Sequence, residues 1–146
     1  MFDDYDDLVF VVDAGGIPGT NFARATNGGV ASASSTTPNS GFPGYNFLPS
    51  GTVDGDRRGG VNFWRDDTAN VYPDWLQVDF NGSHFNGSKS LTEIDVFTVQ
   101  DNDQNTVEPN QVMTFSLNGI TAFDVQYWTG AAWVTVPNGS TANNKV

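Results

Sequence analysis

Cysteine is absent from this chain of 146 residues, so neither a disulfide nor a thiolate metal site forms within it. Basic residues are also scarce: six Lys and Arg stand against 17 Asp and Glu, and the formal net charge is −11. Phosphate binding requires a basic surface, so we expect no nucleic-acid partner. An anionic membrane surface is disfavoured for the same reason.

Long apolar segments are missing as well. No run approaches the roughly 20 residues that cross a bilayer, so we expect no membrane insertion. The first residues are acidic, where a signal peptide would carry basic ones. We therefore expect a mature fragment, a cytosolic protein, or a protein that leaves the cell by lysis, as virion proteins do.

Leucine is scarce, whereas Gly, Ser, Thr, Asn and Asp are abundant and aromatic residues reach 13%. Such a composition disfavours helices and favours short strands joined by turns, with large rings supplying much of the core. We find no segment with a helical pattern. The composition predicts an all-β protein.

Residues 1–20 differ from the remainder. An acidic start leads to the apolar run 8–12, followed by a segment rich in Gly and Pro. The run predicts a short buried strand that belongs to this domain or docks on a neighbour. We treat 1–20 as an N-terminal extension with a candidate interaction or donor strand, and 21–146 as the β-domain.

Alternating apolar and polar residues predict several strands within the β-domain. The clearest are 75–80, 91–100 and 112–120, and two further segments predict a hairpin around 129–131. The side chains expected on one face are Leu76, Val78 and Phe80, then Ile94 and Val96, then Met113, Phe115 and Leu117. Six or seven short strands in this spacing predict an antiparallel sandwich.

Irregular segments connect these strands. The stretch 36–74 is long for a compact domain, and the polar loop 101–111 is expected at the same end of the sandwich, with 81–90 at the other end. Loops held by a rigid scaffold often carry binding residues. We therefore expect binding at the end formed by 36–74 and 101–111.

Several motifs follow one another in an order that resembles the discoidin family, also called the coagulation-factor 5/8 C-type domain. They are NGGVASASS, VDGDRRG, Trp64, PDWLQVDFNG, EIDVFTVQD and FDVQYWTGAAWVTVP, and they span about residues 21–146. The resemblance implies an antiparallel jelly-roll β-sandwich of the galactose-binding-like type, a fold shared with many bacterial carbohydrate-binding modules.

Family members usually continue with two more strands after a sequence like NNKV. A jelly roll without them exposes an edge and an open core. Three interpretations stay open: the chain is a fragment, the N-terminal strand fills the vacancy in its own domain, or a strand is supplied between subunits. The last would make the protein an assembly subunit, a homo-oligomer or an assembly built through the N-terminal segment.

The resemblance also implies a structural calcium ion at Asp54 and Asp56, because calcium takes six to eight oxygens from carboxylates and carbonyls in tight loops. The family's further acidic ligand near its C-terminus is missing here. The alternative is that Asp54 caps the turn through its own backbone. Residues 101–105 resemble the start of an EF-hand loop, but Thr106 and Val112 stand where Gly and Glu are required, which favours a solvated turn.

A glycan site needs an aromatic ring against the apolar face of a sugar, and planar polar groups for its hydroxyls. The candidate rings are Tyr45, Trp64 and Tyr72. The candidate donors are Arg57, Arg58, Asn62 and Arg65. The alternative reading is that Trp64 packs in the core and that the arginines pair with nearby aspartates.

We expect no catalysis, because the only histidine, His84, lies away from the rich loops and no nucleophile, zinc or phosphate-loop motif is present. We expect a non-catalytic carbohydrate-binding or adhesion module, extracellular or on the cell surface, with a glycan or cell-surface polysaccharide as its partner. The alternative is a structural subunit of a virion surface or an extracellular filament, assembled through β-strand or sandwich contacts.

Overall fold

The described part of the chain is all-β, as the composition predicts, with small antiparallel sheets and short 3-10 helices. The computed structural model describes residues 7–11, 20–80, 91 and 93–145. The strands there are β1 (Asp7–Val11), β2 (Gly29–Ala33), β3 (Trp64–Arg65), β4 (Leu76–Phe80), β5 (Asp95–Thr98), β6 (Ala122–Trp128) and β7 (Trp133–Ala142). The 3-10 helices are η1 (Ala25–Asn27), η2 (Asn39–Gly41), η3 (Pro49–Val53) and η4 (Asp103–Asn105). None of the described helices is long and apolar enough to cross a membrane.

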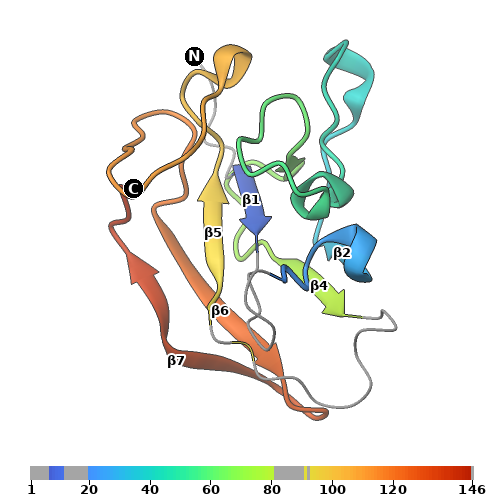
Figure 1. Cartoon of the computed structure of the whole chain (residues 1–146), viewed down its shortest axis with the longest axis vertical. Helices are drawn as coiled ribbons and strands as arrows, with labels where there is room; N and C mark the ends of the chain where they lie inside the picture. The colour runs from blue at the N-terminus through green and yellow to red at the C-terminus, as the bar shows by residue number, and fades with distance from the viewer. Residues whose placement is uncertain (1–6, 12–19, 81–90, 92, 146) are drawn as a thin grey trace.

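The strands form three small sheets, with orders β3-β1-β5, β2-β4 and β6-β7. In Figure 1, β1 in blue and β5 in yellow stand side by side at the centre, and the β6–β7 hairpin runs along one side. The N-terminal apolar run therefore pairs within its own chain, where Leu8 lies opposite Trp64 on one side and Thr98 on the other.

Strand β4 follows the predicted alternation. Leu76, Val78 and Phe80 pack against buried residues, whereas Trp75 and Asp79 are exposed. All five residues of β2 pair antiparallel with β4. One face of this two-stranded sheet is therefore core and the other is surface.

Three clusters of buried residues make up the core. Their buried members are Phe22, Ala23 and Val53 in the first, Phe47, Phe63 and Val99 in the second, and Trp64 and Ile120 in the third. Val96 packs against the third cluster and the next residue, Phe97, against the second. Because neighbouring strand residues point to opposite faces, β5 has core on both sides.

The predicted strand over 112–120 is wrong. The segment contains no strand, and Leu117 is 72% exposed. The cause is Asp101, whose carboxylate accepts hydrogen bonds from the backbone N–H groups of Ser116 (2.8 Å), Leu117 (2.9 Å) and Asn118 (3.2 Å). Backbone donors that bind one carboxylate are not available to a strand ladder.

The predicted hairpin is confirmed. Strands β6 and β7 are joined by a turn in which the N–H of Thr129 donates to the carbonyl of Ala132 at 3.0 Å. Trp128 and Trp133 lie opposite each other with ring centroids 5.5 Å apart, as expected for a cross-strand aromatic pair. The register shifts between Asp124 and Gln126. The loop 81–90, with His84, lies outside the described residues.

Candidate functional site

Residues 54–58 and 100–108 are in contact, and we call the surface that they form the loop rim. The side chain of Gln100 closes the second loop, because its amide donates to the carbonyl of Val107 at 2.7 Å and its oxygen accepts from the N–H of Val107 at 3.0 Å. The same amide reaches the carbonyl of Arg58 at 3.5 Å, and Arg57 binds Glu108. The long irregular stretch and the 101–111 loop are therefore in contact.

The turn at Asp54, Gly55 and Asp56 is held by its own side chains. An oxygen of Asp54 accepts the N–H of Asp56 at 2.7 Å, which is the turn-capping arrangement. Gly55 has a φ of +95°, and a Cβ there would lie 2.6 Å from Nε of Arg24. Arg24 thus covers this turn. Arg24 was not among the candidates predicted from the sequence, because it lies outside both loops.

Asp56 is bound by Arg58 in a two-pronged ion pair, with distances of 2.8 Å and 2.7 Å. The hydrogen bond from Arg58 lowers the pKa of Asp56, and its counterpart raises the pKa of Arg58. The pKa of Asp54 is raised, mainly by burial and less by the neighbouring Asp56 carboxylate. The pKa values of the two carboxyl groups are therefore shifted in opposite directions, although the residues are only two positions apart.

Most carboxylate oxygens of Asp54 and Asp56 already accept hydrogen bonds, which leaves few of them to coordinate calcium. Both oxygens of Asp56 bind Arg58, and one oxygen of Asp54 holds the turn. Within the described part of the chain, no group of three or more His, Asp or Glu side chains is placed to hold a metal ion. Calcium requires six to eight oxygens, so the two aspartates alone do not fit a calcium ion as they stand.

Like Arg58, Arg57 is an exposed donor of the rim. Its guanidinium binds Glu108 and lies over the ring of Phe97 at 5.7 Å from the centroid. The side chains of Arg57 and Glu108 are 47% and 60% exposed, so the pair is solvated and contributes little to stability. A ligand can therefore replace the contact between Arg57 and Glu108 with hydrogen bonds of its own at a small cost in free energy.

Tyr45 joins the rim to the core. Its hydroxyl donates to Asp103 at 3.0 Å, and its ring packs near Phe47 and Phe63. Burial raises the pKa of Tyr45, and the hydrogen bond to Asp103 raises it further, so the hydroxyl keeps its proton. The ring of Tyr45 is partly buried.

Three other sequence candidates, Asn62, Trp64 and Arg65, lie in or beside β3. Trp64 is 2% exposed and its Nε1 donates to the carbonyl of Ser35 at 2.8 Å, so it is a core residue that presents no ring face to a ligand. Arg65 packs over the rings of Phe42 and Phe47. Asn62 is exposed, and its backbone bridges to Asn46.

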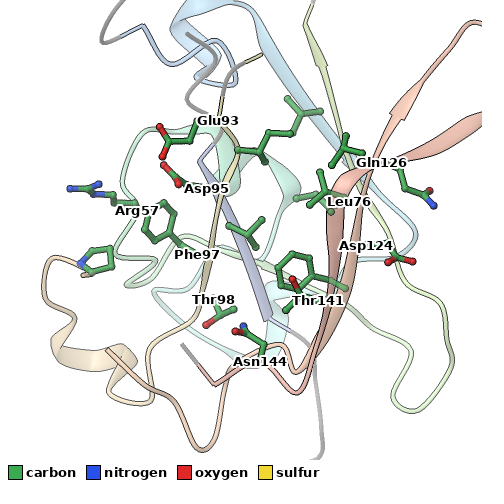
Figure 2. A pocket seen from close by; sticks show the side chains of 18 of the residues that line it. Arg57, Leu76, Glu93, Asp95, Phe97, Thr98, Asp124, Gln126, Thr141 and Asn144 are labelled. Atoms are coloured by element: carbon green, nitrogen blue, oxygen red, sulfur yellow. The ribbon is translucent and has the colours of Figure 1, made fainter. Parts of the chain in front are cut away.

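A second feature, the inter-sheet groove, has a volume of about 1480 Å³ and is lined by residues of β4, β5, β6 and β7. Figure 2 shows Arg57, Glu93 and Asp95 at one side of it and Asp124 and Gln126 at the other. Gln100 and Asp101 also line it, so the groove opens next to the loop rim. The alternating sequence patterns predicted which apolar side chains share a face, but they did not predict a groove between the sheets.

Comparisons of the chain with protein-family models, with curated proteins and with solved structures found no match.

Proposed function

We propose that the chain is a non-catalytic carbohydrate-binding or adhesion module that acts outside the cell or on its surface. Its fold would be an antiparallel jelly roll of the galactose-binding-like type, as the resemblance to the discoidin family implies. The loop rim would hold the ligand, a glycan or cell-surface polysaccharide.

The observation that carries this proposal is a pair of exposed arginines, each held by a carboxylate. Arg57 pairs with Glu108 and Arg58 with Asp56, and both guanidinium groups are about half exposed. A sugar hydroxyl both donates and accepts hydrogen bonds. A guanidinium beside a carboxylate supplies the complementary donors and acceptors, and its fork matches adjacent hydroxyl groups.

The aromatic ring for the apolar face of the sugar must come from residues other than Trp64. Tyr45 reaches the rim through Asp103, and Phe42, which is partly exposed, packs edge-on against Phe47 beside it. We assign the stacking role to Tyr45, because its hydroxyl is bonded to a loop of the rim.

A glycan array with the full chain tests the proposal. We expect binding to a subset of neutral glycans, and at least a tenfold loss of affinity in R57Q and R58Q, because amides replace forked donors. K145Q is the matched control, since it removes one positive charge from an exposed residue outside both loops. Binding that is unchanged in R57Q and R58Q, or absent altogether, would remove the rim from consideration.

Calcium at Asp54 and Asp56 stays a prediction of the family resemblance. Titration calorimetry with calcium alone tests it. A measurable affinity that D54N abolishes would support an ion at this turn. No heat at millimolar calcium would leave Asp54 as a turn cap only.

The alternative function is a structural subunit of a virion surface or an extracellular filament. The inter-sheet groove favours it, because apolar side chains that face an open hollow can be covered by a different subunit of such an assembly. Size-exclusion chromatography with light scattering discriminates the two. A monomer of 15.7 kDa at high concentration counts against self-assembly.

A further inference from the structure

The edge of β5 forms one wall of the inter-sheet groove. Within the described residues β5 pairs only with β1, so its other edge has no strand beside it. Residues 93–102 line the groove without interruption, as a backbone edge does. An exposed edge carries a row of N–H and C=O groups that can pair with another chain.

Apolar side chains form part of the lining of the groove, and the groove is larger than a usual small-molecule site. Its apolar lining includes Leu76, Val78, Ile94, Val96 and Phe123. Sites for small ligands usually measure about 300–1,000 Å³. The groove, at about 1480 Å³, exceeds that range and runs between strands, which suits an extended segment of polypeptide.

The charge around the groove defines the occupant further. Among the residues that the structure describes, the charged ones lining the groove are Arg57, Asp79, Glu93, Asp95, Asp101 and Asp124, five carboxylates and one arginine. Figure 2 shows Glu93 and Asp95 on the β5 side and Asp124 on the β6 side, so acidic groups stand on both flanks. A basic segment is therefore attracted from either side.

A second copy of this chain fits poorly. Each copy carries a formal charge of −11, so a segment of one copy would approach the acidic flanks of another against repulsion. A partner with Lys or Arg at alternate positions of a strand places those residues toward the flanks and its apolar residues toward Val96 and Phe123.

We propose that the inter-sheet groove binds an extended segment of a different protein, with alternating apolar and basic residues, which pairs with the edge of β5. This mode is strand addition, in which backbone hydrogen bonds supply affinity and the alternate side chains supply specificity. It does not depend on glycan binding by the loop rim.

Fluorescence anisotropy with labelled ten-residue peptides tests the proposal on the full chain. The first peptide alternates Val and Lys. The second replaces Lys by Glu, and the third replaces alternate Val residues by Pro, which cannot donate to a ladder. We expect the Val-Lys peptide to bind at least tenfold more tightly than either control. Its affinity should fall as the salt concentration rises, because salt screens the attraction between charges.

Variants of the chain locate the site. E93K should weaken the Val-Lys peptide at least fivefold, whereas D67K makes the same charge change at an exposed residue outside the groove and should leave the affinity within twofold. In a hydrogen-exchange experiment, the backbone amides of β5 should exchange more slowly when the peptide is bound. A glycan array with E93K separates this proposal from the rim, because its glycan binding should persist.

Three results would overturn the proposal. Equal binding of all three peptides would indicate nonspecific contact. Binding that E93K and D67K weaken alike would reflect net charge only. A dimer in light scattering that E93K alters would make a second copy the occupant.

Discussion

Two regions of the molecule differ in how they are held. The segment 20–74 is mostly irregular and contains only the strands β2 and β3, yet it contributes most of the buried residues of the described chain, among them Phe22, Phe47 and Trp64. The β6–β7 hairpin has the longest ladder, yet Trp128 and Trp133 are 52% and 47% exposed. Regular backbone pairing is therefore a poor guide to where this chain buries apolar surface, which is the dominant stabilising term.

Side-chain hydrogen bonds replace the ladder in the irregular stretch. Asp66 is buried, and its carboxylate accepts bonds from the hydroxyl groups of Ser35 and Thr68. Burial acts to raise the pKa of Asp66, but these bonds outweigh it and the pKa is lowered. Thr37 also binds the carbonyl of Asp66. One residue thus joins segments about thirty positions apart.

The largest effect is expected in the buried region. Phe47 is 1% exposed and contacts the rings of Phe42, Tyr45 and Phe63. F47A should lower the free energy of unfolding by about 3–5 kcal/mol, because it removes a ring and leaves a cavity. Urea denaturation followed by circular dichroism measures it. F42A, at a partly exposed partner, should cost clearly less. Equal losses would mean that the burial of Phe47 is not what makes its ring stabilising.

An intermediate effect is expected at Asp101, which connects the loop rim to residues 116–118. Burial acts to raise the pKa of Asp101, but hydrogen bonds from Leu117 and Ser116 outweigh it, and the pKa lies below its ordinary value. D101N should cost roughly 1–2 kcal/mol at neutral pH, because a charged acceptor of several bonds is lost.

The pH dependence gives that prediction a second readout. The folded chain holds the pKa of Asp101 below 3.8, so the stabilisation is complete above that pH and is lost as the pH falls toward the folded pKa. The stability difference between wild type and D101N should therefore shrink between about pH 4 and pH 2. A difference that does not change over this range would remove the carboxylate as its cause.

The smallest effect is expected in the hairpin. W133A should cost about 0.5–1.5 kcal/mol, the contribution of an aromatic pair, because the half-exposed ring of Trp133 loses mainly its contact with Trp128. Urea denaturation of the purified monomer measures it. A loss as large as that of F47A would mean that the hairpin is packed against more than its own strands.

Local patterns were predictable and long-range bonds were not. The alternation of Leu76 and Val78 and the hairpin turn follow from neighbouring residues, so the sequence contains them. The segment 112–120 carries the same alternation, but backbone N–H groups within it donate to the carboxylate of Asp101, which lies fifteen or more positions earlier in the chain. No local pattern records that competition.

The candidate site shows the same division. The capping role of Asp54 was one of two sequence readings, because the turn is local. The pairing of Arg57 with Glu108 spans 51 positions, and only the fold brings them together. A buried tryptophan and a ligand-stacking tryptophan look alike in sequence, since both are aromatic residues beside polar loops, and the burial of Trp64 required the structure.

The burial of Trp64 separates it optically from the other indoles. Trp75, Trp128 and Trp133 are each about half exposed, so a soluble quencher such as iodide reaches their excited states, while Trp64 beside Ser35 is shielded. The chain therefore carries an intrinsic spectroscopic reporter of its interior that needs no added dye.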